Sequence, residues 1–277
     1  MRRLVVVTDL DGTLLDARTY STAAAGPALA ALRARGVPLV LCTSKTRAEV
    51  EPLHGSLGLR APFIVENGGA IVAPAGAWPA ERAPGAPAGE PGEDGTGDAV
   101  IALGTAYTDV VAALAAAAAE SGARVRGFHD MTEAEVAAAT GLPSADAGRA
   151  RQREYGEAFT VLDAAREPAL LAALERRGFR WAIGGRFHHV FAGNDKGEAV
   201  RRVLARYRRA WPGLASAGLG DAPNDISMLC EVDRPVIVRG RHVDVMHERV
   251  PGAVVTAEEG PAGWNTAVLA LLEEFDR

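Results

Sequence analysis

A chain of 277 residues, 48% of them hydrophobic, is long enough for one large domain or for a core with a smaller second module. Its formal net charge of −5 carries no broad basic excess, which argues against nucleic acid or an anionic membrane as a partner. We therefore expect a small-molecule partner. The sequence leaves the oligomeric state open.

Neither a signal sequence nor a membrane span is evident. Asp9 and Asp11 interrupt the apolar run near the N-terminus, and the alanine-rich stretch 110–119 is too short and too weakly apolar to cross a bilayer. We therefore expect a cytoplasmic protein. Cys42 and Cys230 lie in apolar surroundings without metal-ligand spacing, which predicts two buried free thiols.

The first part of the chain alternates between strands and helices. Residues 3–9 form a continuous apolar run ending in a carboxylate, which is typical of a buried parallel strand. A helix is expected near 22–35, with Ser21 or Thr22 as N-cap and Gly36 at the C′ position. The next elements are a strand at 37–42, a helix at 46–57, a strand at 62–66, an Asn67-Gly68-Gly69 turn and a strand at 70–73. This alternation predicts a doubly wound α/β sheet.

Residues 74–98 break the rhythm with proline, glycine, alanine and acids, a composition that predicts a flexible loop. A set typical of an α+β module follows, with strands near 99–103, 158–162, 179–183 and 187–192, and helices near 106–121, 132–140 and 166–177. Thr132 and Glu135 predict a capping box.

The parallel rhythm then returns. It comprises a helix at 196–210, a strand at 214–220, a helix at 223–231, a strand at 235–238 and a helix at 261–275. We therefore expect a core of residues 1–79 and 193–277 that is interrupted by an inserted α+β cap of residues 80–192.

Carboxylates stand where strands of the predicted core end. Asp9 and Asp11 close the first strand and, two residues apart on an extended chain, point to the same side. Asp221, Asn224 and Asp225 follow a later core strand and add oxygen ligands that suit a hard cation. Ligands bind at this edge in open α/β sheets. Two turn aspartates are the plain alternative for Asp9 and Asp11 alone.

Groups that suit an anion stand at the same edge. Thr43, Ser44 and Lys45 follow the second strand at a helix N-terminus, and Lys196 opens the helix after the cap. These two lysines are the only ones among 30 basic residues. A lysine supplies a compact point charge that arginine does not reproduce in a tight pocket.

Through these four clusters the sequence resembles the haloacid dehalogenase superfamily of phosphatases, whose motifs follow in this order. The resemblance implies that Asp9 is the nucleophile and Asp11 the general acid. Lys196 and either Thr43 or Ser44 would hold the transferred phosphoryl group, with Lys45, Asn67 and Gly68 as further candidate phosphate or substrate contacts.

The same resemblance implies a Mg²⁺ site. The four metal-site residues would be Asp9, Asp221, Asp11 through its main-chain carbonyl, and Asp225 in a supporting position. Asn224 would support the same site and contact the phosphate or substrate. Attack by a carboxylate on a phosphate dianion needs positive charge nearby, which Mg²⁺ and a lysine supply.

An inserted α+β cap is typical of the type IIB subgroup, which acts mostly on sugar phosphates. Segments 151–159 and 184–189, together with residues 43–46 and 66–69, also resemble the mannosyl-3-phosphoglycerate phosphatases. That resemblance implies Arg153 and Arg186 as contacts of a substrate carboxylate, and His188 as a contact of a sugar hydroxyl or acid group. An exposed charged helix end and a hairpin with structural histidines are the alternatives.

We therefore expect Mg²⁺-dependent hydrolysis of mannosyl-3-phosphoglycerate to mannosylglycerate through an aspartyl-phosphate. Residues 156–159 read Gly-Glu-Ala-Phe where we expect Ser-Glu-Pro-Phe, so glucosyl-3-phosphoglycerate or another sugar phosphate stays open as the substrate. A phosphomannomutase-like phosphotransferase and a non-catalytic sugar-phosphate sensor are alternatives of a different class. Retention of Asp9, Asp11, Lys196 and Asp221 together argues against the sensor.

Overall fold

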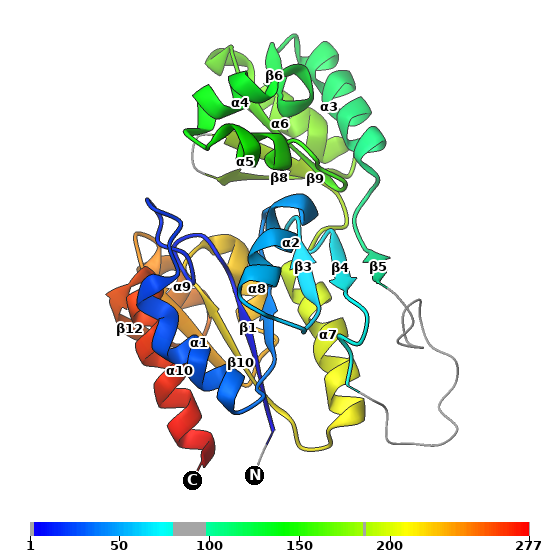
Figure 1. Cartoon of the computed structure of the whole chain (residues 1–277). Coiled ribbons are helices and arrows are strands. Elements are labelled where there is room, and N and C mark those ends of the chain that lie inside the picture. The colour runs from blue at the N-terminus through cyan, green and yellow to red at the C-terminus, as the bar shows by residue number, and fades with distance from the viewer. Residues whose placement is uncertain (1–2, 80–97, 185–186, 277) are drawn as a thin grey trace, which may run out of the picture.

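A five-stranded parallel sheet forms the centre of the larger part of the molecule (Figure 1), in the order β12-β11-β10-β1-β2. The structure is a computed structural model and describes residues 3–79, 98–184 and 187–276. The strands are β1 (Leu4–Thr8), β2 (Leu39–Leu41), β10 (Ala215–Gly220), β11 (Arg234–Arg239) and β12 (Val254–Glu259). Because β1 pairs with both β10 and β2, segments from the two ends of the chain meet in one sheet, as the doubly wound fold predicts.

Helices cover both faces of this sheet. On one face lie α1 (Gly26–Ala34), α2 (Arg47–Ser56) and α10 (Gly260–Asp276), which pack around Leu4 and Val6. On the other lie α7 (Lys196–Ala210), α8 (Ile226–Leu229) and α9 (Val243–Arg249), which pack around Val5 and Val7. The alternation of the β1 side chains between two apolar layers explains why residues 4–7 are hydrophobic without interruption.

A three-stranded antiparallel sheet adjoins the edge at β2. It consists of β3 (Phe63–Val65), β4 (Ala70–Ala73) and β5 (Ala99–Ala102), and an isolated bridge between Cys42 and Ile64 links it to the central sheet. The strand expected near 99–103 as part of the second set of elements thus pairs with β4 instead, in register over all four of its residues. That part of the prediction was wrong.

The inserted cap contains a four-stranded antiparallel sheet in the order β6-β7-β9-β8, which stands above the core in Figure 1. Its strands are β6 (Val125–Gly127), β7 (Gly156–Val161), β8 (Arg180–Gly184) and β9 (Phe187–Phe191). Helices α3 (Tyr107–Ser121) and α6 (Glu167–Arg176) pack on one face around Phe159 and Val190. Helices α4 (Glu133–Thr140) and α5 (Ser144–Ala150) pack on the other around Ala158 and Phe187.

Several local predictions are confirmed. Thr132 and Glu135 form the predicted capping box, and Gly36 has the left-handed φ of +61° expected at C′. The predicted N-cap of the first helix was wrong, because Thr22 makes no capping side-chain bond and α1 follows Ala25; the Ser21 hydroxyl only accepts the N–H of Ala23 at 3.1 Å. Among the described residues, no helix has the length and apolar character needed to cross a membrane.

Other elements differ from the sequence-based expectation. The first helix is divided into a 3-10 turn at Ala23–Ala25 and α1, and the helix expected at 223–231 into a 3-10 turn at Pro223–Asp225 and the shorter α8. Cys230 is exposed, since it follows this short helix at the surface, whereas Cys42 is buried; both are free thiols. Residues 80–97 of the expected loop lie outside the described residues.

Candidate active site

Three carboxylates meet beyond the carboxyl ends of β1 and β10. Asp9 follows β1, Asp221 follows β10, and Asp225 ends the 3-10 turn just after it. The pairing of Thr8 with Leu219 brings the two strand ends together, and the Asp9 N–H donates to the Leu219 carbonyl at 2.9 Å. One oxygen from each of the three aspartates lies within 4.8 Å of the others. The structure thus assembles three of the four predicted metal-site residues into a cluster.

Lys196 stands inside this cluster. It is 2% exposed, and its Nζ donates to Asp9 Oδ1 and to Asp225 Oδ1, each at 2.7 Å. The side chain of Asp195 caps α7 and thereby fixes the helix start from which Lys196 projects. Although burial opposes its charge, the carboxylates of Asp225 and Asp9 raise the pKa of Lys196, so the side chain is an ammonium.

Asp225 is fully engaged by the protein. Its Oδ1 accepts the bond from Lys196, while its Oδ2 accepts the N–H groups of Asp221 and Ala222, both at 3.1 Å. It therefore orients Lys196 and the turn that carries Asp221. Because both of its carboxylate oxygens already accept hydrogen bonds, Asp225 is better placed to support a metal site than to bind the ion directly.

Asp221 is held from the side of the loop after β1. Thr13 Oγ1 donates to Asp221 Oδ1 at 2.9 Å, and a Cβ at Gly12 would lie 2.7 Å from Asp221 Oδ2. Gly12 also has a φ of +81°, so a glycine is required here both by the backbone conformation and by the space.

The cluster carries more negative charge than Lys196 offsets. Burial and the Asp225 carboxylate raise the pKa of Asp9 well above its usual range, and the same two causes raise the pKa of Asp221 to about 6. Three carboxylates around a single ammonium would be stabilised by a further cation. Their oxygen donors suit a hard divalent ion.

Asp11 lies apart from the three clustered carboxylates. Its Oδ2 is 3.0 Å from Lys45 Nζ, while its Oδ1 is buried and has no hydrogen-bond partner among the described residues. Lys45 also lies 3.8 Å from Glu49 in the first turn of α2. The Asp11 side chain thus forms an ion pair with Lys45 in the loop that follows β2. A contribution of the Asp11 main-chain carbonyl to a metal site stays a prediction.

The turn after β3 reaches the same edge. Asn67 Oδ1 accepts a hydrogen bond from Asn224 Nδ2 at 3.1 Å, which joins this turn to the loop of Asp221. A Cβ at Gly68 would lie 2.2 Å from the Asp195 carbonyl oxygen, so only glycine allows this approach to the start of α7.

The candidate hydroxyl groups after β2 differ in access. Thr43 is fully buried, and its Oγ1 accepts the N–H of Lys45 at 3.2 Å, whereas Ser44 is half-buried. A phosphate contact by either hydroxyl stays a prediction.

The three cap residues predicted to bind substrate have different positions. Arg153 reaches the core, with its Nη2 at 3.4 Å from Glu66 Oε2 and 3.5 Å from the Ser44 carbonyl oxygen. Arg186 lies outside the described residues. His188 lies on the α3 and α6 side of the cap sheet, where it stacks on Phe159 and its Nε2 is 3.2 Å from Glu167. The structure therefore does not bring His188 together with the core residues.

His189, the next residue in β9, lies on the opposite face. It pairs with Ala158, which packs with α4 and α5, and its Nδ1 is buried without a partner among the described residues. Burial, and then the charge of Arg153, lowers the pKa of His189 to about 3. The imidazole is therefore neutral in the folded protein at neutral pH.

This lowered pKa predicts acid sensitivity. An unfolded histidine takes up a proton below about pH 6.5 whereas folded His189 does not, so stability is lost as pH falls, by up to about 1.4 kcal/mol per pH unit. Between about pH 7.5 and 5, urea unfolding of the wild type should show a loss that exceeds that of His189→Gln by about 2 kcal/mol. Above about pH 7 the two profiles should run parallel. Equal losses in acid would mean that folded His189 is protonated.

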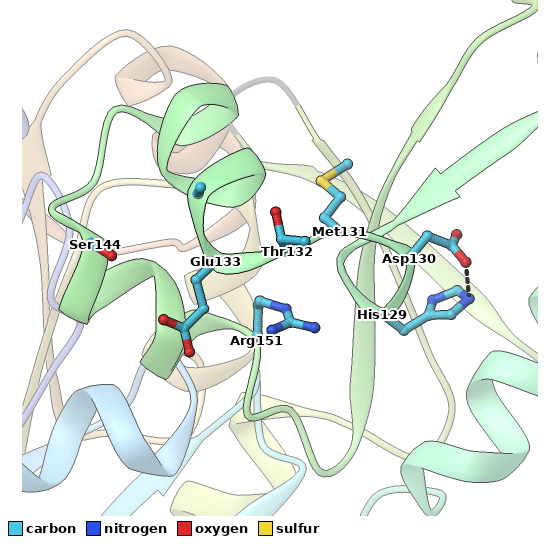
Figure 2. A pocket seen from close by; sticks show the side chains of 8 residues that line it. His129, Asp130, Met131, Thr132, Glu133, Ser144 and Arg151 are labelled. Carbon is cyan, nitrogen blue, oxygen red and sulfur yellow. Dashed lines mark ion pairs between the residues drawn. The ribbon is translucent and has the colours of Figure 1, made fainter.

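The cap also carries a hollow of about 680 Å³ that no residue of the acidic cluster lines. Figure 2 shows Arg151 reaching into it from the segment after α5, with Glu133 to one side, His129 to the other and Thr132 above it in the view. The Arg151 Nε donates to the Phe128 carbonyl at 3.3 Å.

Comparison with known proteins agrees with this arrangement. Residues 6–79 match the family model of haloacid dehalogenase-like hydrolases. The chain is 37% identical over 270 residues to a glucosyl-3-phosphoglycerate/mannosyl-3-phosphoglycerate phosphatase of Methanococcoides burtonii, with 97% of each chain covered. A phosphatase of the same name from Persephonella marina is 35% identical over 278 residues, with 99% of each chain covered.

Among solved structures, a sugar phosphatase of subclass IIB of the haloacid dehalogenase superfamily superposes with a TM-score of 0.64. It is 16% identical in sequence, and 98% of both chains is covered. At this identity the likeness concerns the fold, which includes the cap as well as the core.

Proposed function

Because the chain belongs to the haloacid dehalogenase-like hydrolases and is a phosphoric monoester hydrolase, we propose that it removes the phosphate of mannosyl-3-phosphoglycerate, yielding mannosylglycerate. The observation that carries the proposal is the buried Asp9–Lys196–Asp225 arrangement beside Asp221, in a chain similar over nearly its full length to the two named phosphatases. Glucosyl-3-phosphoglycerate is the alternative substrate, since both sugars stand in the relatives' name.

In the proposed reaction Asp9 is the nucleophile. Lys196 bonds its Oδ1, which leaves Oδ2 to attack phosphorus and to form an aspartyl-phosphate as the ester oxygen departs. The Lys196 ammonium, 2.7 Å from the nucleophile, would also attract the phosphoryl oxygens and offset the repulsion between carboxylate and phosphate.

Asp11 would act as the general acid and protonate the departing oxygen, and would then take a proton from the water that hydrolyses the aspartyl-phosphate. To act as the acid, its carboxylate has to leave the Lys45 ammonium, 3.0 Å away, and take up a proton from solvent before it reaches the substrate. We propose that the substrate phosphate or carboxylate replaces Asp11 as the partner of Lys45.

We further propose a Mg²⁺ site formed by Asp9, Asp221 and the Asp11 carbonyl, with Asp225 and Asn224 in support. The donor set fits the ion, because carboxylate oxygens crowd around a single ammonium and the pKa values of Asp9 and Asp221 are raised. When bound, Mg²⁺ supplies positive charge to the phosphoryl oxygens.

The cap, predicted as residues 80–192 and without the β5 strand that pairs with β4, would supply substrate selection. Arg153 stands where cap and core meet, and its guanidinium suits a carboxylate of the glycerate. A cytoplasmic location stays a prediction.

Phosphate release from a panel of esters tests this function. We expect kcat/KM for a glycosyl-3-phosphoglycerate to exceed that for mannose 6-phosphate by roughly 10-fold or more, since only the former also carries a carboxylate. Treatment with a chelator should abolish release, and added Mg²⁺ should restore it.

Three results would contradict the proposal. Equal kcat/KM for all sugar phosphates would mean that a glycosyl-3-phosphoglycerate is not the preferred substrate. Phosphate found on an acceptor sugar would indicate a phosphotransferase. Saturable binding without any turnover would indicate a sensor.

A further inference from the structure

Glu66 is a buried carboxylate that belongs to the core but is bonded by the cap. It follows β3 and is 1% exposed. Its Oε1 accepts the N–H of Glu154 at 2.7 Å and its Oε2 accepts the N–H of Tyr155 at 3.1 Å. The Arg153 guanidinium lies 3.4 Å from Oε2. Three successive residues of one cap loop thus converge on a single core side chain.

The main chain of the same residue is fixed by the core. Glu66 and Asn67 have left-handed φ angles of +48° and +57°, which are unfavourable for residues other than glycine. Two bonds to the loop after β2 hold this conformation: the Glu66 N–H donates to the Lys45 carbonyl at 2.9 Å, and the Asn67 N–H to the Thr43 carbonyl at 2.8 Å. The main chain of Glu66 therefore helps to hold the loop that carries the candidate phosphate contacts. The side chain of Glu66 binds the cap loop.

Asn194, in the segment that leads from the cap back to the core, links Glu66 and the cap loop. It is 3% exposed, and its Nδ2 donates to the Glu66 carbonyl at 2.8 Å and to the Tyr155 carbonyl at 3.1 Å. Two glycines make room for these contacts. A Cβ at Gly69 would lie 2.6 Å from Tyr155 Cβ, and a Cβ at Gly104 would lie 2.4 Å from Asn194 Oδ1.

The same cap segment meets the core at a second place. Thr46 Oγ1, at the N-terminus of α2, donates to the Arg149 carbonyl at the end of α5 at 2.9 Å. Residues 149–155 therefore lie along the two core loops that follow β2 and β3, and Glu66 provides the charged, fully buried part of this contact.

We infer that Glu66 is a positioning residue whose carboxylate seats cap loop 153–155 on the core while its main chain shapes the turn of Asn67. The inference rests on the proposed function and deepens it. A substrate that is large enough to contact the cap requires loop 153–155, including Arg153, to be held in this position on the core. A small phosphate ester needs only the core residues.

The substitution Glu66→Gln separates the two roles. Glutamine keeps the length of the side chain and the main-chain bonds, but its amide offers one acceptor and one donor, so one of the two cap N–H groups faces another N–H. We expect kcat/KM for the glycosyl-3-phosphoglycerate to fall by roughly 10- to 100-fold, mainly through KM. For p-nitrophenyl phosphate it should change by less than about 2-fold. Amide exchange of Glu154 and Tyr155 should become faster.

Glu135→Gln is the matched control. The Glu135 carboxylate also accepts a main-chain N–H, that of Thr132 at 2.8 Å, and pairs with Arg126, but all of these groups belong to the cap. This variant should keep the wild-type ratio between the two substrates and the wild-type exchange at Glu154 and Tyr155.

Equal losses on both substrates, or unchanged amide exchange at Glu154 and Tyr155, would overturn the inference. Should Glu66→Gln fail to fold, Asn194→Ala carries the same comparison, because it removes the donor that joins the Glu66 and Tyr155 carbonyls. If the wild type released phosphate from no ester, the proposed function would fail, whereas amide exchange would still test the seating of the loop.

Discussion

Replacing Asp9 with asparagine is expected to lower Mg²⁺-dependent phosphate release by roughly 10³-fold or more, because the nucleophile of a covalent mechanism is lost. The fold should survive. Asparagine has nearly the same shape, and its amide oxygen still accepts the bond that Lys196 donates to Asp9 Oδ1 at 2.7 Å. Steady-state phosphate release measures the effect. Acid quenching with radiolabelled substrate should trap phosphate on the wild type and not on the variant.

Asp233→Asn provides the matched control for this experiment. The Asp233 carboxylate, like that of Asp9, accepts a hydrogen bond within the core, here from the Ser216 N–H at 2.9 Å, but Ser216 stands near the start of β10 and Asp221 follows its end. The control variant should retain activity close to that of the wild type. Wild-type turnover by the Asp9 variant would mean that another group attacks phosphorus.

The core of the site could be predicted because parallel strands end at one edge. Asp9 and Asp221 each follow a predicted strand of the core, and neighbouring parallel strands bring such positions together whatever lies between them in the sequence. The scarcity of lysine was informative too, since Lys196 is the buried ammonium of the cluster. Asparagine is scarce too, with four residues in the chain, and one of them, Asn194, is a buried donor to the Glu66 carbonyl.

Contacts between cap and core could not be predicted from local patterns. Glu66 is separated by 88 positions from Glu154, and the bond between them depends on how two units pack. His188 and His189 show a second limit. Adjacent residues of a strand face opposite sides, so a shift of one position decides which histidine meets α6 and which meets α4 and α5.

Several short helices and strands were not predicted from the sequence for a related reason. The helix α5, with the sequence Ser-Ala-Asp-Ala-Gly-Arg-Ala, has no apolar stripe of helical period, and β12 begins with Val254, which is 64% exposed. β6, α5, α9 and β12 are held by their neighbours in the fold and lack a strong pattern of their own.

Lys196→Met should have the largest effect on stability as well as removing activity. The substitution leaves Asp9 and Asp225, each 2.7 Å from the Nζ that is lost, as buried carboxylates without a counter-charge. Removing one partner of a buried ion pair costs about 3 to 5 kcal/mol of unfolding free energy. Urea unfolding in the presence of a chelator measures this loss without a bound metal ion. Phosphate release should fall by at least roughly 10³-fold, as for Asp9→Asn.

A second substitution distinguishes charge from packing as the cause. In Lys196→Met with Asp225→Asn one of the two uncompensated carboxylates is gone, while the amide oxygen can still accept an N–H of Asp221 or Ala222. The double variant should therefore regain about half or more of the stability lost in Lys196→Met. Its activity should stay low, since the phosphoryl group still lacks the ammonium. If the double variant were no more stable than Lys196→Met, the loss would come from packing around the side chain, and the charge balance inferred for this cluster would be wrong.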